Sequence, residues 1–420
     1  MAMLLRARIV LPVSRPLIGD GAVAIAGNRI QAVGRWKDLR AEHRGETFDL
    51  GDAVLLPGLI NAHCHLDYTD LAGEIVPPKS FVDWVQAIVT LKAGWDYSDF
   101  AQSWLNGAKM LLRTGTTTVG DIEAVAELLP EVWDVTPLRV VSFLEMLDIK
   151  GRRPPVEIVA AARQKLEALP VGRGAVGLSP HAPYSTSPGL LAASAWVARR
   201  KQWIVTTHLA ESAEEFEMFM YSRGAMFDWL KRSGRDMGDC GHGSPVQHVE
   251  KAGLAGNNLL AVHVNYLWQD DAARLGRQKA SVVHCPRSHA YFRHQRFPRR
   301  ELAEAGVNIC LGTDSLASMR KVRGQPLELN MFAEMRALAA TTADLPPETI
   351  LRMATSQAAR ALGCAGKIGE LSEHSLADLI VIPFAGKEND AYEAVLQHPG
   401  DVTAAMIDGQ WAMALPGEQL

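Results

Sequence analysis

The dominant pattern of this 420-residue chain is an alternation of apolar runs of strand length with helical segments, from Pro57 to about Gly363. In the helical segments, apolar residues recur near positions i, i+3 and i+4. The expected strands, each ending in polar residues, cover residues 54–65, 116–122, 139–146, 175–181, 203–208, 259–263, 281–284 and 307–314. Helices are expected, for instance, over residues 80–91, 100–113, 156–169, 188–200 and 212–231. Eight such alternations favour a (β/α)8 TIM barrel, an α/β fold, over an open doubly wound sheet.

The two ends of the chain follow a different pattern, with shorter strand-like segments separated by turns. Such segments occur at residues 4–11, 21–34, 377–383 and 402–413. Gly27-Asn28 and Asp408-Gly409 are typical hairpin turns. We expect the two ends to form one small, discontinuous β-sandwich domain, residues 1–56 and 364–420, beside a catalytic barrel of residues 57–363.

The first strand of the predicted barrel ends in His63-Cys64-His65. Side chains at positions i and i+2 of a strand point to the same side, so the two imidazoles have a metal-binding arrangement. His208 ends the fifth strand and Asp314 the eighth, and the ends of barrel strands converge on one mouth. Three nitrogens and one carboxylate are a ligand set typical of a catalytic zinc-like site. Taken singly, His208 could instead be a hydrogen-bonded core histidine and Asp314 a helix cap.

Composition narrows the function classes. The formal net charge of -4 gives no general basic surface, so neither nucleic acid nor an anionic membrane is an expected partner. No apolar run approaches transmembrane length, and arginines interrupt the first apolar stretch, unlike a signal peptide. The five scattered cysteines contain no Cys-x-x-Cys pair and argue against a disulfide framework. We therefore expect a cytoplasmic enzyme with a small-molecule substrate, and a homo-oligomer stays open.

Seven motifs resemble those of the amidohydrolase superfamily. They are PGLINAHCH (57–65), GTTTV (115–119), SPHAPYS (179–185), HLAES (208–212), VHVN (262–265), HCPRS (284–288) and GTDS (312–315). Their order runs through the whole barrel, and the flanking β segments match as well. Within the superfamily the chain is similar to the mononuclear deaminase branch, because Glu211 follows His208 by three positions. His181, rather than the bridging lysine of dihydroorotase and hydantoinase, ends the fourth strand.

The resemblance implies a single divalent metal ion, zinc or iron first, with nickel or manganese as alternatives. The ligands that it implies are His63, His65, His208 and Asp314. It implies that Asp314 accepts a proton from water, that Glu211 protonates a ring nitrogen and that His263 orients the attacking oxygen. Hydrolytic removal of an aromatic amino group requires such proton carriers independently of any resemblance. Without the resemblance, Glu211 could be a helix-start carboxylate and His263 a core histidine.

Residues 78–89 and 180–184 are similar to deaminases of adenosine derivatives altered at the 5′ position. The expected substrates are S-adenosylhomocysteine, methylthioadenosine and, above all, aminodeoxyfutalosine. The resemblance implies that His181 contacts the purine or the ribose. Trp84 could cover the mouth of the barrel or merely pack its helix, and Glu145 could bind substrate or be structural.

Arg287 and His289 directly follow the seventh predicted strand in a locally basic segment. We expect one of them, or Arg293, to bind an anionic group of the substrate, such as a carboxylate. The chain departs from its relatives at two places: many carry Asn at the position of His289, and a ribose-binding Glu has no counterpart within residues 89–94.

Two other classes of function compete with a nucleoside deaminase. The first is a chlorohydrolase, or a guanine-, cytosine- or triazine-type amidohydrolase, with the same mononuclear site. The second is a non-catalytic scaffold of the hydantoinase-like kind, which the complete set of ligand-type residues disfavours.

Overall fold

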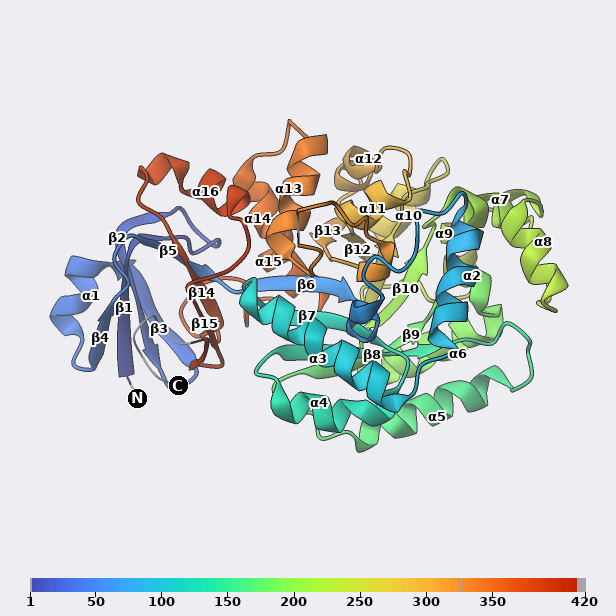
Figure 1. The fold of residues 1–420 in the computed structure, drawn as a ribbon, viewed down its shortest axis with the longest axis horizontal. Helices are drawn as coiled ribbons and strands as arrows, with labels where there is room; N and C mark the ends of the chain where they lie inside the picture. The colour runs from blue at the N-terminus through green and yellow to red at the C-terminus, as the bar shows by residue number, and fades with distance from the viewer. Residues whose placement is uncertain (1, 325, 414–420) are drawn as a thin grey trace.

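The computed structural model describes residues 2–324 and 326–413. Its larger part is a sheet of eight parallel strands, ordered β6 to β13 as in the sequence, with helices around it (Figure 1). The strands are β6 (Leu59–Cys64), β7 (Thr116–Glu123), β8 (Arg139–Met146), β9 (Ala175–Pro180), β10 (Val205–Leu209), β11 (Leu259–His263), β12 (Ser281–His284) and β13 (Asn308–Leu311). A bridge between Cys64 and Asp314 connects the first strand to the last. The predicted (β/α)8 barrel is confirmed.

The helices of the barrel follow the strands as the apolar periodicity predicts. The first half contains α2 (Phe81–Lys92), α3 (Tyr97–Arg113), α4 (Leu129–Val135), α5 (Pro155–Ala168), α6 (Pro188–Lys201), α7 (Ala213–Tyr221), α8 (Ala225–Arg232) and α9 (Pro245–Lys251). The second half contains α10 (Asp271–Arg277), α11 (Pro286–Tyr291), α12 (Arg299–Glu304), α13 (Met331–Thr341), α14 (Pro347–Met353) and α15 (Ser356–Ala361). No helix of the described residues is long and apolar enough to cross a lipid bilayer.

Two elements that the sequence predicts as continuous are each divided into two in the structure. The expected strand 54–65 breaks at Gly58, where an added Cβ would lie 2.1 Å from the Thr117 hydroxyl. The first piece, β5 (Ala53–Pro57), pairs with the terminal sheet, and only the second, β6, belongs to the barrel. The expected helix 212–231 breaks between α7 and α8, where Ser222 and Gly224 adopt positive φ angles of 51° and 99°. A left-handed residue ends an α-helix.

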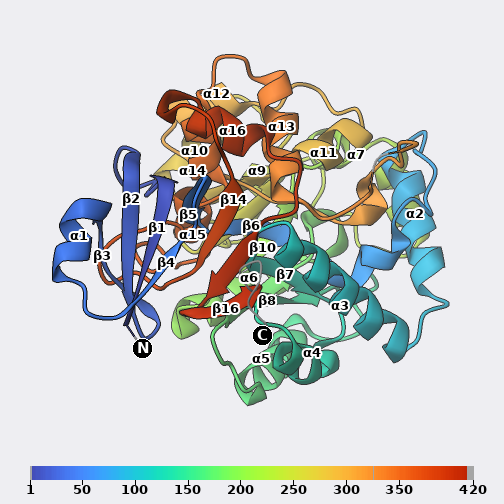
Figure 2. The ribbon, with the colours of Figure 1, turned by 60° about the vertical axis from the view of Figure 1, so that its left-hand side comes forward.

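The strands from the two ends of the chain form one mixed sheet beside the barrel (Figure 2). They are β1 (Ala2–Val10), β2 (Ile18–Ala26), β3 (Arg29–Arg35), β4 (Glu46–Asp49), β5, β14 (Leu379–Pro383), β15 (Ala404–Ile407) and β16 (Gln410–Met413), with α1 (Trp36–Glu42) and α16 (Ala391–Gln397) alongside. Both predicted hairpin turns are present, between β2 and β3 and between β15 and β16. The turns meet, because Asn28 donates a hydrogen bond of 3.1 Å to Asp408. The strands that were expected to form the two layers of a sandwich are therefore hydrogen-bonded into one sheet.

The terminal sheet packs against the barrel through a shared hydrophobic core. Ile9 and Val54 of the sheet lie in one cluster of buried side chains with Phe332 of α13 and Val395 of α16. The domain limits at residues 56/57 and 363/364 stay a prediction. Residues 1 and 414–420, which the predicted small domain includes, lie outside the described part of the chain.

A buried ion pair joins the two units. Arg139, at the start of β8, donates two hydrogen bonds, of 2.9 and 3.2 Å, to the carboxylate of Asp378, just before β14. Both residues are at most 7% exposed. Removal of one partner leaves the other charge buried and unpaired, which costs more than the loss of an exposed pair.

We therefore expect Asp378→Ala to lower the free energy of unfolding by about 3 kcal/mol or more, measured by equilibrium urea denaturation. Glu127→Ala is the matched control, because it removes the carboxylate of the exposed Lys165–Glu127 pair. We expect that change to cost less than about 1 kcal/mol. Equal effects of the two substitutions would show that the buried pair does not hold the units together.

Candidate metal centre and active site

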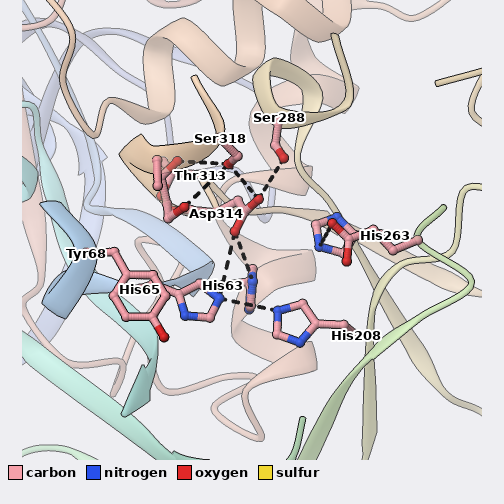
Figure 3. A network of polar contacts seen from close by, with 12 residues as sticks. His63, His65, Tyr68, His208, His263, Ser288, Thr313, Asp314 and Ser318 are labelled. Carbon is pink, nitrogen blue, oxygen red and sulfur yellow. Dashed lines mark hydrogen bonds and ion pairs between the residues drawn. The ribbon is translucent and has the colours of Figure 1, made fainter. Parts of the chain in front are cut away.

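Two histidines of β6 and its end face an aspartate that follows β13 (Figure 3). The Nε2 atoms of His63 and His65 lie 3.7 and 3.8 Å from Oδ1 of Asp314. The other oxygen of Asp314, Oδ2, accepts hydrogen bonds from the hydroxyls of Ser288 (2.6 Å) and Ser318 (2.8 Å). These serines orient the carboxylate, so that Oδ1 is directed at the imidazoles.

His208, at the end of β10, completes this group. Its Nε2 lies 3.3 Å from Nε2 of His65, and its Nδ1 donates a hydrogen bond of 2.8 Å to the carbonyl oxygen of His181. A carbonyl can only accept, so Nδ1 carries the proton and Nε2 keeps its lone pair for a ligand. Second partners of this kind orient metal-binding histidines in proteins.

The donor set fits a divalent metal ion. Both ring nitrogens of His63 are buried without a hydrogen-bond partner among the described residues. Burial lowers the pKa of His208 to about 3 and that of His65 well below its usual value, so both imidazoles are neutral at physiological pH. Neutral imidazole and carboxylate are the forms that bind zinc and similar ions. The structure thus contains a buried cluster of histidine and aspartate side chains that could hold a metal ion: His63, His65 and Asp314 form one group, and His63, His208 and His263 another.

Two further titratable groups face this centre. Glu211, after β10, lies with an oxygen 3.5 Å from Nε2 of His263, at the end of β11. Atoms of Glu211, His263 and Asp314 lie within 4.8 Å of one another. Burial, followed by the negative charges of Asp314 and Glu215, raises the pKa of Glu211 well above its usual value. Burial therefore favours the protonated form of the Glu211 carboxyl, which is the form that a proton donor uses.

The centre lies at the base of a cavity of about 620 Å³. Trp84, Glu145 and His181 line this cavity together with Glu211 and Asp314. The indole N–H of Trp84 donates to the carbonyl of Ala317 (3.1 Å), so this hydrogen bond attaches α2 to the segment after β13, and Trp84 lines the cavity. His181 binds the hydroxyl of Ser185 (2.6 Å), and its Nε2 lies 3.9 Å from Glu145.

Comparison with known proteins agrees with this geometry. The family described as Amidohydrolase family matches residues 54–412. A 5-methylthioadenosine/S-adenosylhomocysteine deaminase of Syntrophobacter fumaroxidans is 36% identical, over 87% of this chain and 80% of the relative. The chain belongs to the amidohydrolase family. A shorter match, to an imidazolonepropionase-like composite domain of bacteria, covers residues 21–45.

Two further proteins are similar to this chain over most of its length. An aminodeoxyfutalosine deaminase of Deinococcus radiodurans is 28% identical, over 82% of this chain and 81% of the relative. The crystal structure of an adenosine deaminase from Xanthomonas campestris, with bound zinc, superposes with a TM-score of 0.84 at 26% identity. That superposition covers 99% of this chain and 94% of the other.

Arg287 and His289 do not reach the cavity of this amidohydrolase. The guanidinium of Arg287 donates to the carbonyl of Glu328 (2.9 Å) and lies 3.7 Å from the carboxylate of Glu334. His289 is bonded to Asn265 at 3.0 Å. Helix α11 turns directly after β12 and carries these side chains away from the mouth. None of Arg287, His289 and Arg293 lines this cavity, and Arg287 and Arg293 line a separate pocket, so the contact with an anionic substrate group stays a prediction.

Four cationic residues other than those predicted line the cavity. The side chains of Lys92, Lys150, Arg152 and Arg153 line the cavity, and none has a carboxylate partner among the described residues. Lys92 also contacts the hydroxyl of Tyr68, whose ring stacks on His65 with centroids 5.0 Å apart. Sequence reasoning missed these residues. The only signal was the charge of residues 150–153, immediately after the third barrel strand, where active-site loops begin.

The serines behind Asp314 generate a prediction about metal affinity. We expect Ser288→Ala to weaken zinc binding roughly 10- to 100-fold, because the aspartate loses a partner that orients it. Affinity is measured by competition with a chelator of known strength. Ser142→Ala is the control, because the Ser142 hydroxyl is also buried but has no hydrogen-bond partner among the described residues. Equal affinities of the Ser288 variant and the wild type would contradict the role of this hydrogen bond.

Proposed function

We propose that this chain is a metal-dependent aminohydrolase that removes the amino group from an adenine nucleoside altered at its 5′ position. The observation that carries the proposal is the approach of Glu211 and His263 to Asp314 within one buried cluster. A cation bound by the four ligands would polarise water and lower its pKa toward neutrality. Zinc is the first candidate and iron the second, because imidazole and carboxylate accept both.

The residues around this centre can perform the proton transfers of a deamination. Oδ1 of Asp314 is free of hydroxyl partners and can accept a proton from the attacking water. Nε2 of His263 is buried without a hydrogen-bond partner among the described residues and can orient that water. Glu211 can deliver its proton to the ring nitrogen next to the amino-bearing carbon. The proton that Asp314 accepted can then pass to the amino group, which leaves as ammonia, while the new hydroxyl on the same carbon returns a proton to Glu211 and becomes a carbonyl.

The cavity supports a substrate with an extended 5′ group. Its lining includes the apolar residues Ile149, Ile158, Trp229 and Leu230, together with the exposed cationic residues Lys150, Arg152 and Arg153. An apolar lining with unpaired cations favours a 5′ group with an apolar portion and a carboxylate. S-adenosylhomocysteine and aminodeoxyfutalosine have such a group, and methylthioadenosine has no carboxylate. The relative named for S-adenosylhomocysteine is 36% identical to this chain and the relative named for aminodeoxyfutalosine is 28% identical, so sequence identity supports S-adenosylhomocysteine at least as well as aminodeoxyfutalosine.

We expect the zinc-loaded enzyme to release ammonia from 5′-substituted adenosines faster than from adenosine, guanine or cytosine. Glu211→Gln should lower kcat by about 10²- to 10⁴-fold, because a positioned proton donor is lost. The metal content of the variant should remain that of the wild type. Ammonia is measured with a coupled assay, and halide release from a chlorotriazine is measured in parallel. Halide release without ammonia release would instead support the chlorohydrolase alternative.

The cationic residues of the cavity lead to a test of the substrate's charge. We expect Arg152→Ala to raise KM for a carboxylated nucleoside about tenfold, the equivalent of about 1.4 kcal/mol, and to leave KM for methylthioadenosine within about twofold. Arg163→Ala is the control, because Arg163 is a half-buried residue of α5 that does not line the cavity. An equal rise of KM for both nucleosides would rule out recognition of the carboxylate by Arg152.

A further inference from the structure

One buried amide joins the loops that follow three neighbouring barrel strands, β10, β11 and β12. Nδ2 of Asn265 donates a hydrogen bond of 3.0 Å to the carbonyl oxygen of Glu211. Oδ1 of Asn265 is then the acceptor for His289, whose Nδ1 lies 3.0 Å away. Asn265 is 5% exposed, so water does not compete for these bonds. We call this group of Asn265, His289 and the Glu211 carbonyl the clasp.

The clasp restrains two strained turns. Ala210 has a φ of 49°, and the consecutive residues His263 and Val264 have φ values of 73° and 52°. This left-handed region is unfavourable for residues other than glycine, and most of all for β-branched valine. The turns face each other, and the backbone N–H of Asn265 donates to the carbonyl of Ala210 (2.9 Å). Strained backbone of this kind persists only where its surroundings hold it.

Glu211 itself is held on both sides of its main chain. The buried carboxylate of Glu215 accepts hydrogen bonds from the N–H groups of Ala210 (3.1 Å) and Glu211 (2.8 Å). The clasp holds the carbonyl of Glu211 from the opposite side. Between these two restraints, the Glu211 carboxyl lies 3.5 Å from His263. The main chain of the proposed proton donor is thus set by side chains from three different elements.

The surroundings of His289 fix its ring. The imidazoles of His284 and His294 pack against it, with centroids 5.2 and 5.4 Å away. His294 is in turn bonded to the hydroxyl of Tyr266 (3.2 Å), which belongs to the same loop as Asn265 but makes no bond to the clasp. Neither Asn265 nor His289 lines the substrate cavity. Any effect of these two residues on the reaction must therefore be indirect, through the residues that the clasp holds, of which Glu211 is directly bonded to it.

We propose that Asn265 and His289 are positioning residues that hold Glu211 next to His263 for proton transfer. The inference rests on the proposed function, because it concerns the proton donor of that site. It requires a hydrogen-bond donor at the position of His289 Nδ1, and not an imidazole as such. The amide nitrogen of asparagine is bonded to Cγ, as Nδ1 of histidine is, so His289→Asn keeps a donor at this position.

The proposal is tested with four single variants and one double variant of the zinc-loaded protein. We expect Asn265→Leu and His289→Leu each to lower kcat at least about tenfold, because small displacements of a catalytic group are costly, with KM within about twofold. His289→Asn should keep kcat within about threefold of the wild type, and so should the control Tyr266→Phe. The double variant, Asn265→Leu with His289→Leu, should have a kcat no lower than that of either single variant, because each single substitution already breaks the clasp.

Amide hydrogen exchange tests the role of the clasp independently of the proposed function. Exchange of residues 209–216 should be faster in both leucine variants, with bound zinc unchanged, and unaltered in His289→Asn and Tyr266→Phe. This readout holds even if the wild type deaminates none of the nucleosides offered. The proposal would be overturned if kcat and the rate of amide exchange in both leucine variants were the same as in the wild type. Equal impairment of His289→Asn and His289→Leu would also overturn it. If Asn265→Leu does not fold, Asn265→Ser, whose side chain is too short for both bonds, takes its place.

Discussion

Closure of the barrel between its first and last strands is the interaction on which the active site depends. The carbonyl oxygen of His63 accepts hydrogen bonds of 3.1 Å from the N–H groups of both Thr313 and Asp314. The buried side chain of Asn61 strengthens this junction, because it binds both the N–H and the hydroxyl of Thr313. Gly312 permits the close approach, since an added Cβ would lie 2.8 Å from the His63 carbonyl. His63 and Asp314, two residues of the candidate metal centre from opposite ends of the barrel sequence, thereby become neighbours.

Burial then determines the protonation states that the chemistry requires. Removal from water disfavours every charged form, so histidines lose protons and isolated carboxylates gain them. His181 and His208 have pKa values lowered to about 3 by burial, and Glu211 has its pKa raised. Asp314 is the exception: burial alone would raise its pKa, but His63 and the other imidazoles lower it well below the usual value. One buried cluster therefore favours neutral histidines, an ionised Asp314 and a protonated Glu211.

Sequence patterns correctly predicted the elements whose geometry depends on residues close together in the chain. The two hairpins at Gly27-Asn28 and Asp408-Gly409 formed as their turn residues predict, because turn geometry is a short-range property. The same reasoning joined residues 54–65 into one strand, because it could not register that Thr117 excludes a side chain at Gly58. It also directed Arg287 toward the mouth, although the partners Glu328 and Glu334 lie 41 and 47 positions further on. Contacts of that kind leave no periodic signal.

By itself, the sequence determined the order of strands and helices, and with it the set of ligand-type residues at strand ends. These follow from periodicity and from the rule that parallel strands present their carboxyl ends together. Only the tertiary structure decided how the side chains pair across the mouth. It turned Arg287 toward Glu334, lined the cavity with Lys92 and Arg152, and linked Asn265 to both Glu211 and His289. The physical reason is that loop side chains take their direction from partners distant in the chain, whereas strand ends take theirs from the backbone.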